Sequence, residues 1–157
     1  LQLYYPHMNY NITVWGSACE TTLMPLIVQQ KRLIRLLYGS QHYLSHTSPM
    51  FKELKLLKLN DIYKFNISIY MYKILKGEAP GVVVTEIDKN QNQHSHATRQ
   101  DLTYIKTPQY NLEICRKALS YKGPQIWNGL HLSVRDCQSL QSFKKKLKLN
   151  IISNYDQ

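Results

Sequence analysis

Residues 61–76 constrain the fold of this chain more than any other segment, because they have the length of a helix and are apolar almost all round. Ile, Phe, Met and Tyr side chains would fall on every face of such a helix, and Gly77 follows as a stop. A helix without a clear polar face is usually buried among other elements. We therefore expect residues 61–76 to form a central helix of a mainly α fold.

Two further helices are predicted before this central segment. Residues 22–38 place apolar side chains on one face, with a threonine as the cap and Gly39 as a left-handed stop. Ser48 followed by Pro49 predicts the cap and the first residue of a short helix. These elements indicate an irregular helical bundle.

The C-terminal part combines a turn, a Trp-Asn pair and a lysine-rich helix. Gly123 and Pro124 predict a turn, from which Pro124 opens one helical turn that contains Trp127. Ser139 predicts the cap of a last helix, whose apolar side chains recur at steps of three and four residues. That apolar stripe consists of Leu140, Phe143, Leu147 and Ile151.

A few segments favour extended structure. Residues 82–84 and 102–105 are candidate short strands, whereas residues 88–100 have the polar composition of an exposed loop. The sequence thus predicts a mainly α fold, an irregular helical bundle with one short β-hairpin or a few extended segments. Its expected parts are a helical part at 1–77, an exposed linker or loop at 78–111 and a C-terminal helical extension at 112–157.

The charge of the chain indicates what it could bind. The formal net charge is +10, with 20 Lys and Arg against 10 Asp and Glu. Such an excess favours a polyanionic partner, and nucleic acid before a membrane surface. The alternative is a basic domain without a specific partner. No apolar run has membrane-spanning length, so no membrane partner is expected.

The cysteines and the start of the chain bear on its cellular context. Cys19, Cys115 and Cys137 are odd in number and far apart, which favours an intracellular location, nucleus or cytoplasm, over a disulfide framework. The chain begins within an apolar pattern and without Met, which suggests a fragment of a longer polypeptide.

The residue types of a catalytic centre are present but scattered. The Asp and Glu residues are neither adjacent nor at a useful helical spacing, so two-metal chemistry is not expected. The pairs His42/His46 and His94/His96 match no zinc pattern and lie in polar segments, which favours solvated loop histidines. There is no Gly-rich phosphate loop, and we expect no metal or other cofactor in this chain.

Basic side chains gather in two of the predicted helices. They are Lys31, Arg32 and Arg35 in the first, and Lys144, Lys145, Lys146 and Lys148 in the last. Lys and Arg at such positions can neutralise phosphates without recognising a base sequence. The alternative interpretation of each cluster is a solvated helix face.

A series of motifs recurs here in an order shared with a known family. The segments that carry it are 4–16, a Tyr-rich stretch ending in Trp-Gly; 28–35, a Gln-Lys-Arg-X-Ile-Arg helix; 46–51, His-Thr-X-Pro with Phe; 54–63, a Leu-rich stretch ending in Asp-X-Tyr; 94–99, ending in Thr-Arg; and 121–128, with Gly-Pro and Trp-Asn. Along essentially its whole length, the chain resembles the region just after the catalytic part of reverse transcriptases from non-LTR retrotransposons, of the jockey-like and LINE-like classes.

This resemblance implies a role without catalysis. The family's Tyr- or Phe-X-Asp-Asp polymerase motif lies upstream of this region and does not occur here, so residues 1–77 would be thumb-like and residues 112–157 a C-terminal extension. The parent enzyme would be an RNA-directed DNA polymerase that uses Mg. The implied partners are an RNA template, an RNA–DNA hybrid or DNA, and the upstream polymerase domain, with no small-molecule substrate. The expected phosphate contacts are Lys31, Arg32, Arg35, Arg99, Lys144, Lys145 and Lys148.

Two other hypotheses remain open at this point. The chain could be a helical interaction or structural module without a nucleic-acid role, whose basic surface meets acidic protein partners. It could also be a hydrolase that uses Cys115 or Cys137 with a histidine as its nucleophile.

Overall fold

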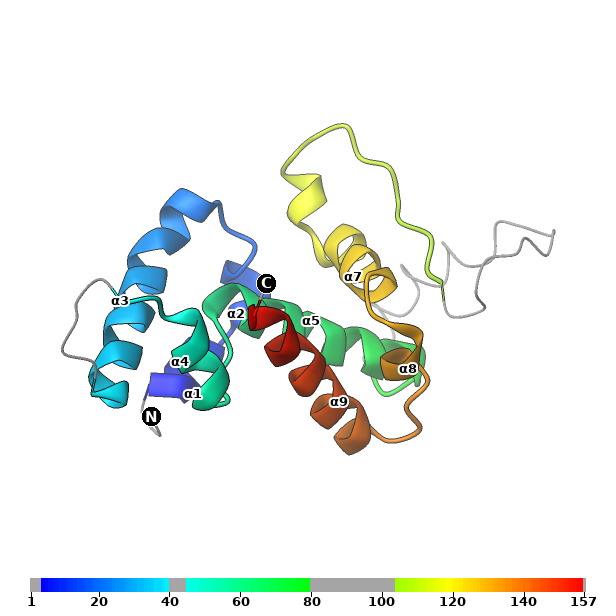
Figure 1. The fold of residues 1–157 in the computed structure, drawn as a ribbon. Coiled ribbons are helices and arrows are strands. Elements are labelled where there is room, and N and C mark those ends of the chain that lie inside the picture. The colour runs from blue at the N-terminus through cyan, green and yellow to red at the C-terminus, as the bar shows by residue number, and fades with distance from the viewer. Residues whose placement is uncertain (1–3, 40–44, 80–103, 157) are drawn as a thin grey trace, which may run out of the picture. The chain divides into compact units, whose positions relative to one another are not determined.

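The computed structural model describes residues 4–39, 45–79 and 104–156, and every regular element in these ranges is helical (Figure 1). This confirms the predicted mainly α fold. The elements are α1 (Tyr4–Asn9), α2 (Ile12–Trp15), α3 (Glu20–Tyr38), α4 (Ser48–Glu53), α5 (Leu59–Leu75), η1 (Cys115–Lys117), α7 (Leu119–Asn128), α8 (Leu132–Arg135), α9 (Leu140–Ser153) and η2 (Asn154–Asp156).

The two candidate strands of the sequence fall mostly outside the described residues, and the described part of them is not a strand. Residues 82–84 lie outside the described residues, as do the first two of residues 102–105. Tyr104 and Ile105, which are described, have no regular structure, and the backbone of Ile105 is bonded to a side chain of α7. None of the helices in the described ranges has both the length and the apolarity to cross a membrane.

The chain forms two compact units, one made of Leu1–Phe65 with Lys145–Gln157 and the other of Asn66–Lys144. Both α5 and α9 contribute residues to each unit. Leu59 and Ile62 of α5 are buried in the first unit, whereas Met71 and Tyr72 are buried in the second. The apolar pattern predicted for residues 61–76 thus serves two cores.

The helix ends agree with the sequence prediction at their glycines and differ at two caps. Gly39 ends α3 with a left-handed φ of 71°, and the φ of 72° at Gly77 follows α5 in the same way. The predicted Thr cap of α3 is wrong, because the helix starts at Glu20 and Cys19 occupies the N-cap. In α4 the cap is Thr47, one residue before the predicted Ser48.

The first unit has two neighbouring apolar clusters. One is formed by Met8, Ile12, Leu23, Leu57, Leu59, Ile62 and Ile152, and the other by Ile34, Met50 and Phe51. Tyr155, from the C-terminal end of the chain, packs against both. The C-terminal residues are therefore part of the core that the N-terminal helices build.

Between α4 and α5 the chain passes through this core in a non-helical conformation, and side chains pair its backbone. The amide of Gln30, itself buried, donates from Nε2 to the Leu57 carbonyl at 3.0 Å and accepts from the Leu59 N–H at 2.9 Å. The hydroxyl of Tyr5 accepts from the Leu57 N–H at 3.1 Å. These bonds supply partners that no helix or sheet provides to a buried backbone.

The second unit is built around a group of aromatic rings. Tyr72 stacks on Phe143 with ring centroids 4.7 Å apart, and Trp127 lies 5.8 Å from Phe143. The side chain of Asn128 pairs with the backbone of Ile105 in both directions, at 2.7 and 3.0 Å. In the Trp-Asn pair, Trp127 therefore belongs to the aromatic core, and Asn128 holds the backbone of Ile105 through two hydrogen bonds.

The predicted turn at Gly123 and Pro124 is wrong. Both residues lie buried inside α7, which runs without a break from Leu119 to Asn128. Leu119, Gly123 and Trp127 recur every four residues, and this helical period prevails over the turn preference of Gly-Pro. A Cβ at Gly123 would lie 2.5 Å from the Met71 Sδ, so the glycine permits a close approach of α7 to the Met71 side chain.

We expect Gly16→Ala to destabilise the first unit by about 1–3 kcal/mol, because an added methyl group would overpack its surroundings. A Cβ at Gly16 would lie 2.5 Å from both the Ile12 carbonyl oxygen and the Tyr63 ring. Urea unfolding measures the change. Gly129→Ala is the matched control, since a Cβ there meets its nearest atom at an ordinary 3.5 Å. Equal stability of the two variants would contradict the argument.

We expect Gln30→Leu to lower the free energy of unfolding by about 2–5 kcal/mol, since it leaves a buried carbonyl and a buried N–H without partners. Gln29→Leu changes an exposed neighbour in the same helix and should stay within about 0.5 kcal/mol of the parent. Denaturant titration of both variants tests this clamp, by which we mean the two hydrogen bonds of the Gln30 amide to the backbone of Leu57 and Leu59. A Gln30 variant as stable as the Gln29 variant would show that the clamp adds nothing to stability.

Candidate nucleic-acid interface

Two of the three predicted phosphate contacts of α3 are well exposed. Lys31 and Arg32 are exposed, and no hydrogen bond or ion pair involves either side chain within the described residues. Arg35 is half-buried, and its Nε donates to the Ser45 carbonyl at 3.3 Å. Arg35 therefore ties α3 to the segment before α4, a role that the sequence did not indicate.

The lysines of α9 are arranged around its buried stripe. Ser139 caps this helix as predicted, since its Oγ accepts from the Ser142 N–H at 3.2 Å. Phe143 and Leu147 are buried, which confirms the core side of the predicted stripe. Lys144 and Lys145 are exposed, Lys148 is half-buried, and none of the three has an interaction within the described part of the chain.

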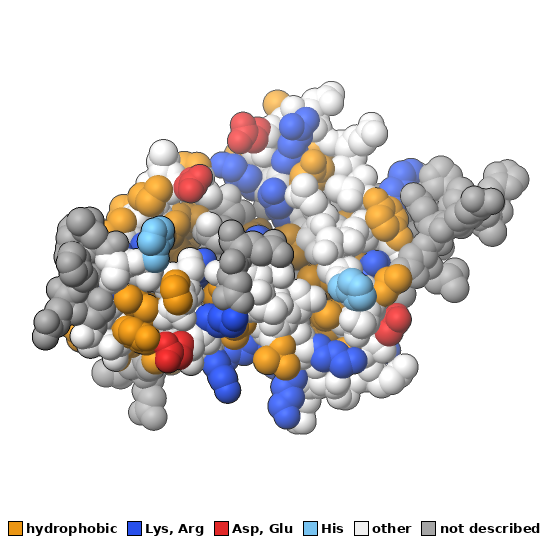
Figure 2. Space-filling view, in the orientation of Figure 1, with side chains coloured by type: hydrophobic (Ala, Val, Ile, Leu, Met, Phe, Trp, Pro, Cys, Tyr) orange, Lys and Arg blue, Asp and Glu red, His pale blue; other side chains and the backbone are white. Residues whose placement is uncertain are grey.

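The remaining candidate, Arg99, lies outside the described residues. Figure 2 shows Lys and Arg side chains spread over the face that it draws, with few Asp and Glu among them. Within α5, Lys64 forms an ion pair with Asp61 over 3.7 Å. Most of the candidate cations thus remain available to an external anion.

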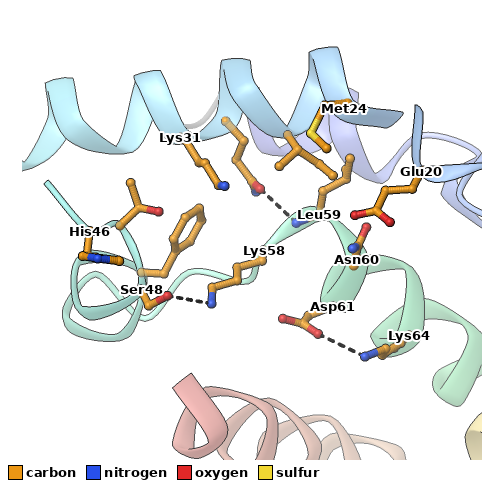
Figure 3. Close-up of a pocket in the computed structure, with 14 residues that line it drawn as sticks. Glu20, Met24, Lys31, His46, Ser48, Lys58, Leu59, Asn60, Asp61 and Lys64 are labelled. Carbon is orange, nitrogen blue, oxygen red and sulfur yellow. Dashed lines mark hydrogen bonds and ion pairs between the residues drawn. The ribbon is translucent and has the colours of Figure 1, made fainter. Parts of the chain in front are cut away.

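A cleft in the first unit brings one of these cations together with groups that the sequence did not indicate (Figure 3). Its volume is about 430 Å³, and α3, the α4 region and the start of α5 supply its walls. Lys31, Lys58, Lys64, His46, Thr47 and Ser48 line it, together with Glu20, Asn60, Asp61, Gln30, Met24, Ile27, Phe51 and Leu59. Lys58 lies between two buried leucines in sequence, a pattern that predicts an outward-facing side chain, so the sequence held no signal for its place in the cleft.

Tyr155 fixes one wall of this cleft. Its hydroxyl accepts from the Lys58 N–H at 3.0 Å and donates to the Asp61 carboxylate at 2.7 Å. The Lys58 ammonium lies 4.3 Å from the centre of the Tyr155 ring and donates to the Ser48 hydroxyl at 3.0 Å. Burial raises the pKa of Tyr155, the Lys58 N–H lowers it, and the bond to Asp61 raises it further, so the neutral phenol is strongly favoured.

The other chemistries considered from the sequence are not assembled in the described residues. The thiol of Cys137 is buried and contacts the Ser133 carbonyl and the Ser142 hydroxyl, while the His131 ring bonds Ser133 as a helix cap. No Cys–His pair forms there, and His42, His94 and His96 lie outside the described ranges. Within the described residues, no three His, Cys, Asp or Glu side chains gather as metal ligands.

Comparison with known proteins gives no relative of this chain, since no protein-family model, no curated protein and no solved structure matches it. The geometry and the sequence motifs therefore carry the functional argument by themselves.

We expect Tyr155→Phe to lower the free energy of unfolding by about 1–3 kcal/mol at neutral pH, because the Lys58 N–H and Asp61 lose their shared partner. The raised pKa of Tyr155 adds a pH signature. Its contribution is fully present below the unfolded-state pKa of about 10 and is lost as the pH rises above that value.

Chemical unfolding of both proteins between pH 7 and about pH 11 measures this signature. The difference between the parent and Tyr155→Phe should shrink above pH 10. Tyr10→Phe is the control, because this exposed hydroxyl has no hydrogen bond within the described residues. A difference that stays constant across the whole range would rule out the proposed role of the hydroxyl.

Proposed function

We propose that this chain binds nucleic acid through the phosphate backbone, as a non-catalytic C-terminal fragment of a retrotransposon RNA-directed DNA polymerase that helps to hold the template-primer. The observation that carries the proposal is the state of the cations on α3 and α9. Lys31, Arg32, Lys144 and Lys145 are exposed, and none is neutralised by an acidic side chain within the described residues.

The chemistry of these groups favours phosphate over other anions of the cell. Several cations on helical surfaces neutralise several phosphates of a polyanion at once, and each contact releases counterions. Lys and Arg at such positions do not distinguish bases, so the binding should be independent of sequence and sensitive to salt. The net charge of +10 adds long-range attraction to the same partner.

The sequence resemblance supplies the biological part of the proposal. It suggests an RNA template, an RNA–DNA hybrid or DNA as the ligand and the upstream polymerase domain as a protein partner. In such an enzyme the Mg-dependent chemistry would belong to the upstream domain. An intracellular site of action, nucleus or cytoplasm, fits the same proposal.

A protein-interaction role is the second candidate, and the outer surface of α3 favours it. Leu36 is 77% exposed and Leu37 is 39% exposed on this helix, beside the basic residues. Exposed leucines on a helix can pack against apolar side chains of a protein partner, whereas a nucleic-acid backbone offers them no apolar surface. In that case the basic residues would meet acidic side chains of the partner.

We expect Arg32→Glu and Lys145→Glu each to weaken binding to an RNA–DNA hybrid and to lower the slope of log affinity against log salt by about 1. Fluorescence anisotropy with a labelled hybrid over a salt series measures both effects. Lys117→Glu is the matched control, since it makes the same charge change at an exposed position in η1.

Two outcomes would count against the proposal. The first is the absence of hybrid binding by the parent chain near physiological salt, which would favour the protein-interaction role. The second is an equal loss for Lys117→Glu, which would show that net charge acts without any particular surface.

A further inference from the structure

The cleft of the first unit is asymmetric in its charge. Figure 3 shows Lys31, Lys58 and His46 toward one end, and Glu20 and Asn60 toward the other. At the first end two lysines and a histidine lie on a shared cleft, and the carboxylate drawn beside Lys58, that of Asp61, is engaged by the Tyr155 hydroxyl and by Lys64. An anion would be attracted more strongly to this end than to the other, where Glu20 offsets the charge of Lys64.

The groups at the basic end have unused hydrogen-bonding capacity. Lys31 and His46 have no interaction within the described residues, and Lys58 commits one ammonium proton to Ser48. Thr47 lines the cleft, and its hydroxyl has no hydrogen-bond partner among the described residues. This hydroxyl can therefore donate to, or accept from, a ligand in the cleft.

The rest of the cleft offers a surface of a different kind. Met24, Ile27 and Leu59 add apolar surface to the lining of the cleft. Glu20 can accept and Asn60 can both donate and accept hydrogen bonds at the far end. The charge of Asp61 is already engaged by the Tyr155 hydroxyl and by Lys64.

The volume of the cleft limits what it can hold. At about 430 Å³ it falls near the lower end of the range for small-ligand sites, roughly 300–1,000 Å³. A ligand that fits has a phosphate at one end, a flat apolar body in the middle and a hydrogen-bonding edge at the other end. A nucleoside monophosphate has all three parts.

We propose that this cleft binds one nucleoside monophosphate group, with its phosphate held by Lys31, Lys58 and Thr47. The base lies against Met24 and Ile27, and its edge meets Glu20 or Asn60. The group can come from a free nucleotide or from the phosphorylated end of a single strand. Neither Arg32 nor any residue of α9 lines this cleft, so binding of the ligand does not depend on them.

The test is isothermal titration of the whole chain with adenosine 5′-monophosphate, adenosine and inorganic phosphate. We expect Lys31→Gln to weaken binding of the monophosphate about tenfold, the loss of one charge-assisted contact. Thr47→Val keeps the shape of the side chain and should weaken binding severalfold. Lys58→Gln should also weaken it, with thermal unfolding as the check that the wall around Tyr155 remains folded.

Arg32→Gln is the matched control, since Arg32 lies next to Lys31 in α3 but does not line the cleft. It should leave monophosphate affinity unchanged while lowering affinity for an RNA–DNA hybrid, so the two proposals fail separately. A 5′-phosphorylated trinucleotide then distinguishes the sources: tighter binding than the monophosphate indicates a strand end, and equal binding indicates a free nucleotide.

The proposal is overturned if the parent chain does not bind the monophosphate, or if Lys31→Gln and Thr47→Val bind it as well as the parent does. Equal affinity for inorganic phosphate and for the monophosphate would remove the nucleoside part of the site. Binding of adenosine as tightly as the monophosphate would remove the phosphate part.

Discussion

The first unit depends on how the backbone between Leu57 and Leu59 is paired inside an apolar core. Both leucines are buried, and Leu57 and Lys58 precede α5, which begins at Leu59. The N–H groups of these three residues and the Leu57 carbonyl therefore have no partner within a helix. Side chains from three distant segments supply them: Tyr5 from α1, Gln30 from α3 and Tyr155 from the C-terminal end. An unpaired group at this depth would cost more than most single contacts gain. The segment therefore specifies which helices must meet around it.

In the second unit, too, a side-chain amide pairs a buried stretch of backbone that lies outside the helices. Ile105 is fully buried in an extended stretch, and the amide of Asn128 takes the place of a neighbouring strand by bonding both its N–H and its carbonyl. A side-chain amide carries a donor and an acceptor on one planar group, as a peptide unit does. In a chain with no strand among its described residues, Gln30 and Asn128 allow segments without regular structure to enter the cores.

The sequence predicted those features of the fold that depend on residues close together in the chain. The central helix, the left-handed stop at Gly39 and the Ser139 cap depend on neighbouring residues, and the structure shows all three. The helix through Gly123 and Pro124 was missed because it depends on a close approach to Met71, about fifty residues earlier in the chain. At the candidate interface, exposure of Lys31 and Arg32 followed from helix periodicity. The bond from Arg35 to Ser45 and the inward position of Lys58 arise from tertiary contacts that periodicity does not contain.

The cleft and the clamp on the backbone are made by the same few residues, and this links recognition to stability. Tyr155 holds the Lys58 backbone and orients Asp61, while the ammonium of Lys58 lies at the basic end of the cleft. Gln30 pairs Leu59, and both side chains line the same space. A ligand that binds Lys58 and not the unfolded chain would stabilise the whole first unit by mass action. Because the Lys58 ammonium is held by the Ser48 hydroxyl and lies over the Tyr155 ring, this cation is positioned before any ligand arrives, which lowers the entropic cost of binding.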